Sequence, residues 1–417
     1  MTAPDGKPSA LKLLRDRPAG GFIQGKLPVG CVMCEQGKKM VLFVTGVCHY
    51  KCFYCPISEE RRMATDAWAN EKRVAADDLA AIAAEARTIG ATGTGLTGGD
   101  PMYDPERTLR YIRFLKSEFG PKHHIHMYTQ IPFDPKWIPA LAEAGLDELR
   151  FHPPEEIWAD VDAHPKYARL YKEALASSMD IGFEIPCIPG FLSSMEKLVG
   201  WLVAHEVAFI NLNEMEFSET NYVEMLKRGM RIRDDVSMSA MESADVARAL
   251  MAKHRDQPIT IHFCSSPFKD AIQLRERLRR RAQAVARPHE VITDDGTLLR
   301  GVVDCPDPAE VAEEMREAFD IPADLIHVRL ATDVGRGSLN PDERTEAMAT
   351  TGRAIPLPVV HAKPQAARDR LEVAPWVLEE IAEEIPFPCY LSEVYPTADE
   401  LEVERTPLNG KPGVPDA

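Results

Sequence analysis

Short apolar runs recur along the first two thirds of the chain, and segments with helical spacing of apolar positions separate most of them. Strands that alternate with helices of about 10–15 residues are typical of parallel βα units. Six such strands predict an α/β fold, a partial (β/α)6 barrel, whose chemistry lies in the loops that follow the strands. The expected strands are 40–47, 92–99, 124–130, 148–153, 181–190 and 209–215, with helices at 75–89, 105–119, 135–144, 168–177 and 194–205.

The pattern changes near residue 287. A seventh apolar run at 259–266 leads into a segment, 274–287, that carries six arginines and ends before Pro288. We expect an amphipathic helix that closes the barrel, and a contact to RNA or phosphate is the alternative. Beyond it, elements in the order β-α-β-β-α-β predict a smaller α+β domain of ferredoxin-like type. The expected strands are 296–303, 325–330, 354–361 and 389–395, and the expected helices are 308–319 and 375–385.

These patterns divide the chain into an irregular lead-in at 1–37, a barrel domain at 38–287 and an acidic α+β domain at 288–417. The net charge is −16, and the last region alone has 27 acidic against 11 basic residues. This acidity gives no support to non-specific nucleic-acid binding by the last region. RNA remains a candidate partner for the rest of the chain.

Composition also bears on the compartment. The mean hydropathy is −0.25, and no apolar run approaches the roughly 18 residues that a membrane-spanning helix needs. The first residues lack the basic and apolar pattern of a secretion signal, so we expect a cytoplasmic protein without a membrane partner. The chain has nine cysteines, an odd number, and five lie between positions 31 and 55. In a reducing compartment such crowding favours metal binding over a disulfide framework.

Three of these cysteines follow the expected strand at 40–47. Cys48, Cys52 and Cys55 have the spacing C-x3-C-x2-C. Thiolates this close on one loop can hold a single inorganic core, and three ligands leave one iron of a four-iron cluster without a protein thiolate. An open iron can bind a substrate or cofactor directly. The alternative is a zinc site completed by His49 or Cys34.

A further pair, Cys31 and Cys34, lies just upstream with the spacing C-x2-C. This pair predicts half of a second site, either another iron–sulfur cluster or zinc, with Cys264 as its third ligand. The alternative is that these thiols are only packed, because free cysteine is often buried. The reserve ligands for this second site are Cys187, Cys305 and Cys389.

The segment Cys48–Cys55, with an aromatic residue before its last cysteine, resembles the radical S-adenosylmethionine (SAM) superfamily, whose pattern is C-x3-C-x-aromatic-C. A second landmark of that family is a Gly-Gly-Glu turn after the second strand, and this chain has Gly98, Gly99 and Asp100 there. The resemblance covers about residues 40–266. It is more specific toward an archaeal-type group related to pyruvate formate-lyase activating enzymes, through GKKMVLFVTG and CFYCP.

The resemblance implies a [4Fe–4S] cluster on Cys48, Cys52 and Cys55, with SAM bound at its open iron. One electron, from a donor of ferredoxin or flavodoxin type, would cleave SAM into methionine and a 5′-deoxyadenosyl radical that takes hydrogen from a substrate. The resemblance does not identify that substrate, which we expect to be a macromolecule or a metabolite, and the catalytic side chains remain unknown. Activation of a glycyl-radical enzyme is a further candidate reaction, which we rank below modification of another macromolecule or of a metabolite. The cofactor-binding residues that it implies are Tyr54, Gly98, Gly99, Asp100, Gln130, Arg150, His152 and Glu184.

The competing hypothesis is a non-catalytic binding protein. In that case zinc, or a fully protein-ligated iron–sulfur centre, only holds the N-terminal region together. Such a closed centre offers no position for SAM, whereas a three-cysteine cluster does.

Overall fold

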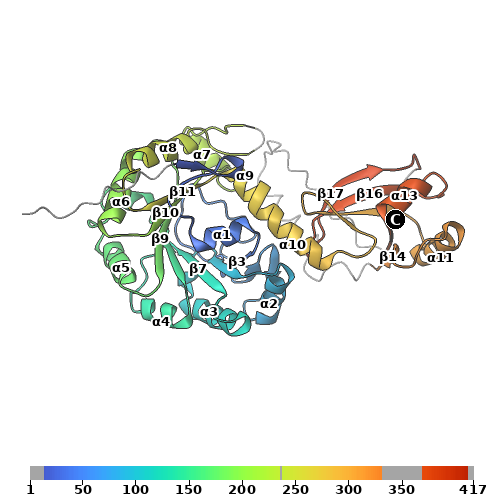
Figure 1. The fold of residues 1–417 in the computed structure, drawn as a ribbon, viewed down its shortest axis with the longest axis horizontal. Coiled ribbons are helices and arrows are strands. Elements are labelled where there is room, and N and C mark those ends of the chain that lie inside the picture. The colour runs from blue at the N-terminus through green and yellow to red at the C-terminus, as the bar shows by residue number, and fades with distance from the viewer. Residues whose placement is uncertain (1–13, 235–236, 331–368, 412–417) are drawn as a thin grey trace, which may run out of the picture. The chain divides into compact units, whose positions relative to one another are not determined.

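The computed structural model describes residues 14–234, 237–330 and 369–411 (Figure 1). The chain divides into two compact units, Met1–Leu274 and Arg275–Ala417. None of the helices in the described ranges combines the length and apolar character required to cross a membrane.

A parallel sheet is the centre of the first unit. In sheet order, its strands are β3 (Lys39–Phe43), β6 (Gly93–Thr97), β7 (His124–Thr129), β8 (Glu148–Phe151), β9 (Asp180–Pro186), β10 (Phe209–Asn213) and β11 (Thr260–Cys264). Each pairs in parallel with the next, so the six expected strands and the seventh apolar run are confirmed. Antiparallel strands extend both edges, and in the described chain no pairing joins the two ends of this order, as expected of a partial barrel. The edge strands are β4 (Ala67–Ala69) and β5 (Lys72–Val74) on one side, and β2 (Phe22–Gln24) and β1 (Leu14–Asp16) on the other.

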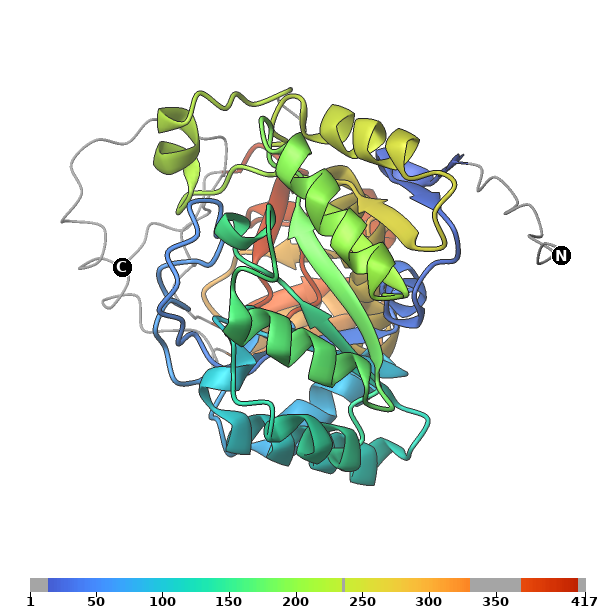
Figure 2. The ribbon, with the colours of Figure 1, turned by 90° about the vertical axis from the view of Figure 1, so that its left-hand side faces the viewer.

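Helices cover the outer side of the curved sheet (Figures 1 and 2). Those between the strands are α2 (Leu79–Thr88), α3 (Pro105–Phe119), α4 (Trp137–Ala144), α5 (Pro165–Leu175), α6 (Leu192–Ala204), α7 (Tyr222–Lys227) and α8 (Ser243–Lys253). In α3, Asp104 caps the start by accepting a hydrogen bond from the Arg107 N–H (3.1 Å), and Pro105 occupies the first turn, where no N–H is needed. Gly120 ends this helix with φ of 84°.

The N-terminal lead-in is structured from residue 14 onward, which corrects the expectation of an irregular segment. Strand β2 pairs antiparallel with β11, and β1 pairs with β2. Helix α1 (Val29–Glu35) follows and lies on the inner side of the curved sheet (Figure 1). Gly30 permits this position, because a Cβ there would lie 2.5 Å from His126 Nδ1.

The second unit contains an antiparallel sheet whose strand order is β14 (Ile326–Arg329), β15 (Arg370–Val373), β13 (Leu298–Val303), β16 (Cys389–Val394) and β17 (Glu402–Pro407), with β12 (Val291–Ile292) beside β13. Helices α11 (Pro308–Phe319) and α13 (Pro375–Ile381) alternate with these strands. The first four strands along the chain beginning at β13 lie in the order 2-3-1-4, all antiparallel, which is the expected ferredoxin-like arrangement. Counted along the chain, the third of these strands is β15. The sequence predicted the third strand at 354–361, which lies outside the described residues.

The arginine-rich helix α10 (Arg275–Val285) belongs to the second unit, whereas the expected boundary was at residue 287 and the helix was expected to close the barrel. Ala282 packs with Leu298 and Val394 of the second unit, and Arg281 donates a hydrogen bond to the Pro396 carbonyl. The apolar spacing in the sequence shows that the helix is amphipathic, but it does not show which core the apolar side meets.

Candidate active site

A cavity of about 360 Å³, the first cavity, lies at the ends of the parallel strands of the first unit. Cys48, Cys52 and Cys55 all line it, are half-buried and form no disulfide. They lie in the segment 44–66, which joins β3 to β4 without a helix or strand. The structure therefore brings the three predicted cluster ligands to one cavity, at the strand ends where the sequence predicts chemistry.

Gly98 and Gly99 line the same cavity and approach the cysteine loop closely. A Cβ on Gly98 would lie 2.4 Å from the Thr45 carbonyl oxygen, and one on Gly99 would lie 2.4 Å from the Val47 carbonyl oxygen. The Gly99 N–H also donates to the Thr45 carbonyl (2.7 Å). Side chains are thus excluded from this turn, and its backbone can come close to a bound molecule.

Asp100 is buried and ties this turn to the next strand. Its carboxylate accepts hydrogen bonds from the backbone N–H groups of Gln130 (2.6 Å), Ile131 (3.1 Å) and Met102 (2.9 Å), and from the Thr129 hydroxyl (3.0 Å). The side chain therefore supports the wall of the cavity, and it offers the cavity no free carboxylate.

Tyr54, Gln130 and His152, three of the residues that the resemblance implies for cofactor binding, also line the first cavity. His152 Nδ1 lies 2.7 Å from the Glu184 carbonyl oxygen, which can only accept, so we assign the hydrogen to Nδ1. Nε2 then accepts from the Tyr54 hydroxyl (3.0 Å). Burial lowers the pKa of His152, in agreement with this neutral form. The Gln130 amide nitrogen lies 3.3 Å from Cys52 Sγ and can donate to it.

Charged residues to which the sequence analysis gave no role line the first cavity as well. Glu214 and Glu216 follow β10, and Lys269 lies shortly after β11. Lys269 Nζ pairs with Glu216 (3.1 Å), and the Ser266 N–H donates to Glu214 (2.8 Å). The signal that could have identified them is position, because each lies within five residues of the end of a parallel strand.

Arg150 and Glu184 do not line the first cavity but a second cavity of about 120 Å³, which is also lined by Cys31, Cys34 and Cys264. Arg150 Nη1 donates to Glu184 (2.9 Å), and its Nε pairs with Glu148. Asn211 and Asn213 donate to Glu184 as well (3.0 and 2.9 Å). Burial raises the pKa of Glu184, but the charge of Arg150 and the hydrogen bonds from these amides have the larger effect. Together they hold the pKa of Glu184 below its usual value. The structure therefore separates these two residues from the other expected cofactor residues.

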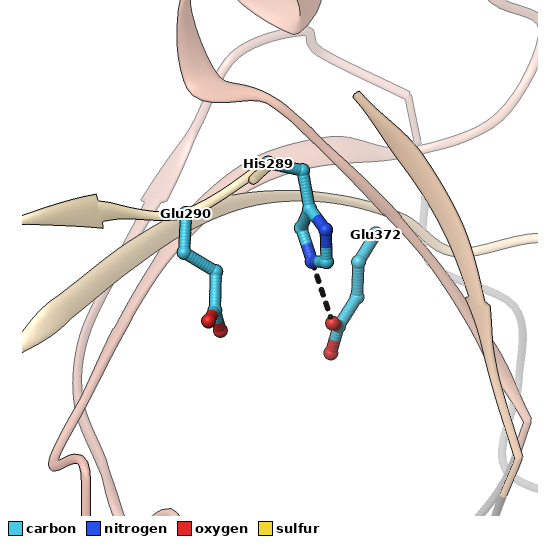
Figure 3. Close-up of side chains that lie close together, drawn as sticks. All are labelled: His289, Glu290 and Glu372. Atoms are coloured by element: carbon cyan, nitrogen blue, oxygen red, sulfur yellow. Dashed lines mark hydrogen bonds and ion pairs between the residues drawn. The ribbon is translucent and has the colours of Figure 1, made fainter. Parts of the chain in front are cut away.

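The second unit contains one group of close metal-ligand side chains among the described residues, His289, Glu290 and Glu372 (Figure 3). Glu372 is fully buried and accepts from His289 Nε2 (3.1 Å). Four guanidinium groups surround the same carboxylate, which already balances its charge and opposes a metal cation. These are Arg287 (3.3 Å), Arg300 (3.0 Å), Arg329 (3.5 Å) and Arg370 (2.8 Å).

The first cavity fits the cluster and SAM that the resemblance implies. Three unpaired thiols on one loop form the donor set of a cluster with an open iron, and the turn that excludes side chains lies beside them. Burial raises the pKa of Cys48 to about 11, so this thiol is protonated at neutral pH and becomes a ligand by releasing its proton to the incoming metal.

Comparison with known proteins agrees with this geometry. The sequence profile of the radical SAM superfamily matches residues 42–153, and a profile described as a domain of unknown function matches 357–408. A protein of Methanocaldococcus jannaschii, provisionally named a glycyl-radical enzyme activating enzyme, is 36% identical over 395 residues, which cover 92% of this chain and 93% of the relative.

Two solved structures are also similar. Methylornithine synthase has 15% identity and a TM-score of 0.36, covering 52% of this chain and 63% of that one. SuiB of Streptococcus suis, bound to SAM, has 12% identity and a TM-score of 0.39, covering 55% and 50%. With its cysteine pattern, its family profile and a relative that spans nearly its whole length, the chain is an enzyme that belongs to the radical SAM superfamily.

Proposed function

We propose that the chain binds a [4Fe–4S] cluster through Cys48, Cys52 and Cys55, binds SAM in the first cavity, and cleaves it reductively. The observation that carries this proposal is that the three loop cysteines and the Gly98–Gly99 turn line one cavity. When bound, the cluster and SAM supply a 5′-deoxyadenosyl radical that abstracts hydrogen from a substrate.

The residues of the chain have supporting roles in this proposal. The Gly98–Gly99 turn presents backbone groups to the methionine part of SAM, and Asp100 holds that turn against β7. Gln130 donates to the Cys52 sulfur, and hydrogen bonds of this kind tune the potential of a cluster. His152 and Tyr54 form a neutral pair that can contact the nucleoside without adding charge. The strand ends and the cysteine loop line the cavity and would shield bound SAM partly from water.

The charged side of the first cavity, formed by Glu214, Glu216 and Lys269, is the proposed substrate side. The provisional name of the M. jannaschii relative favours glycyl-radical activation, which the sequence alone ranked below other substrates. A glycine-containing peptide segment of a partner enzyme is therefore the first substrate candidate. A metabolite or another macromolecule, including RNA, is the alternative. The electron comes in either case from a one-electron donor of ferredoxin or flavodoxin type.

The test uses full-length protein reconstituted without oxygen and reduced with dithionite. We expect it to form 5′-deoxyadenosine and methionine from SAM. The variants Cys48→Ala, Cys52→Ala and Cys55→Ala should each reduce this activity by more than about 100-fold, because each loses a cluster ligand. Cys389→Ala, the same change in the second unit, is the matched control and should keep the activity. Fully loaded protein that forms no 5′-deoxyadenosine would overturn the proposal.

A further inference from the structure

Three cysteines that the proposed function does not use line one cavity of the first unit. Cys31 and Cys34 are three residues apart on α1, so their side chains lie on the same side of the helix. Cys264 is the last residue of β11, which pairs with β2 just ahead of α1. All three line the second cavity, and none forms a disulfide. The fold thus brings together thiols that are far apart in the sequence.

The sulfur atoms of these cysteines would have to move closer together to share a single zinc ion. Tetrahedral zinc with Zn–S bonds of about 2.3 Å places its sulfur ligands about 3.8 Å apart. The sulfur atoms of Cys31, Cys34 and Cys264 do not all lie within 4.8 Å of one another, and neither do those of the three loop cysteines. As they stand, neither group of three has the spacing of ligands to one zinc ion, and a core of several metal atoms spans larger distances.

The polar groups around the second cavity suit a sulfur-ligated core. Arg150 Nη2 and Asn211 Nδ2 each lie 3.4 Å from Cys31 Sγ, and Gln273 Nε2 lies 3.6 Å from Cys264 Sγ. All three nitrogen atoms carry hydrogens that can be donated to sulfur. Donors of this kind stabilise the negative charge that cysteine ligands carry in an iron–sulfur cluster.

Lys39 gives an independent indication of an anion in this cavity. Its side chain lines the cavity, and the residue is only 6% exposed. Arg150 and Lys269 have carboxylate partners in Glu184 and Glu216. In the described part of the chain no carboxylate lies within ion-pair distance of Lys39, whose ammonium has a long contact, 3.5 Å, to the Gly30 carbonyl oxygen and lies 5.9 Å from the centre of the Tyr128 ring. Burial lowers the pKa of Lys39, and a negative group in this cavity would offset the cost of burying its charge.

We propose that Cys31, Cys34 and Cys264 bind a second iron–sulfur cluster in the second cavity. Cysteine ligands bring negative charge next to Lys39, and a core of several metal atoms can join sulfur atoms that lie farther apart than the ligands of one zinc ion. Tyr128, Asn213 and Lys269 line both cavities, so the second cluster lies next to the space proposed for SAM. The site shares no ligand with the proposed loop cluster and can be tested separately from it.

The experiment measures iron, zinc and sulfide per chain, with electron paramagnetic resonance (EPR) after reduction, on full-length protein reconstituted without oxygen. The triple variant Cys48→Ala/Cys52→Ala/Cys55→Ala should keep bound iron and an EPR signal, because the second site remains. The double variant Cys31→Ala/Cys34→Ala should lose between about a third and a half of the wild-type iron, depending on whether the second cluster has two or four irons. The double variant Cys187→Ala/Cys389→Ala is the matched control and should keep all of it.

A folded triple variant without iron would overturn the second cluster, and so would zinc in place of iron there. If Cys31→Ala/Cys34→Ala does not fold, as judged by circular dichroism, Cys264→Ser in the triple background decides the question. Loss of the remaining iron supports the proposal, and retention contradicts it. If instead the loop cysteines bind no cluster, Cys31→Ala/Cys34→Ala should lose all of the iron found in the wild type. The two failures are therefore distinguishable.

Discussion

The two cavities of the first unit differ in size and in the elements that line them. The first is about 360 Å³ and is lined by three cysteines of an irregular loop, whereas the second is about 120 Å³ and is lined by cysteines of α1 and β11 together with the buried side chains of Lys39 and Arg150. In the proposed reaction SAM is consumed, so its cavity must let it enter and leave. A resident cluster has no such need. The comparison agrees with the two proposals, which place an exchanging cofactor in the larger cavity and a permanent one in the smaller cavity.

The largest expected effect is on the ion pairs of the second cavity. Arg150→Gln leaves Glu148 and Glu184 buried without their cation, and breaking such a pair costs about 3–5 kcal/mol. Because the pKa of Glu184 is lowered in the folded protein, its favourable contribution is present above its unfolded pKa of about 4.3 and is lost as the pH falls further. The loss of stability should therefore be full at pH 7 and shrink below about pH 4. Thermal unfolding without oxygen at several pH values measures it, and a loss that does not depend on pH would contradict this account.

The next effect concerns the first cavity. Gly99→Ala places a Cβ 2.4 Å from the Val47 carbonyl, so the turn must move away from the cysteine loop. We expect the dissociation constant for SAM to rise about 100-fold, or about 2.7 kcal/mol, while the iron content stays unchanged. Equilibrium dialysis with labelled SAM measures the affinity. Gly200→Ala in α6 is the control, because a Cβ there meets no atom within 4 Å. Unchanged affinity in Gly99→Ala would remove the role of this turn.

A smaller effect is expected where α1 enters the barrel. Gly30→Ala would bring a Cβ within 2.5 Å of His126 Nδ1 and 2.9 Å of Arg150 Nη2. Overpacking of this kind costs about 1–3 kcal/mol, and we expect α1 to shift and the iron of the second cavity to be lost. The free energy of unfolding and the iron content report the two effects, with Gly200→Ala again as the control. A variant with full iron and normal stability would show that α1 does not need this close fit.

The smallest effect concerns the potential of the loop cluster. Gln130→Leu removes the amide that donates to Cys52, so the reduced cluster loses a stabilising hydrogen bond and its reduction potential falls. A redox titration followed by EPR measures the shift. Gln273→Leu, which changes the corresponding amide beside Cys264, should leave this potential unchanged. Equal shifts in both variants would mean that the two cavities are not electronically separate.

The sequence predicted the features that depend on local patterns. Apolar periodicity identified the parallel strands and α3, and the spacing of Cys48, Cys52 and Cys55 identified the loop that lines the first cavity. It did not predict β2 or α1, because these short elements exist through their contacts with β11 and the inner face of the sheet. The composition of residues 1–37, which are rich in Gly and Pro, does not indicate such contacts.

The sequence also did not predict which of the two cavities a given strand residue lines. Arg150 and His152 were expected on one face of a strand, and alternation predicts this correctly. Two residues of strand span about 6.6 Å, however, which is enough to place His152 in the first cavity and Arg150 in the second. Periodicity therefore identified the face of the strand, but the depth in the barrel depends on how the strands are staggered.

The central claim is that Cys48, Cys52 and Cys55 leave one iron open for SAM. The most direct measurement is electron–nuclear double resonance on the reduced, fully loaded protein with SAM labelled with nitrogen-15 in its amino group. This account predicts a coupling between the labelled nitrogen and the cluster, which disappears in Cys52→Ala and remains in Cys389→Ala. A cluster with full occupancy that shows no coupling to bound, labelled SAM would contradict it.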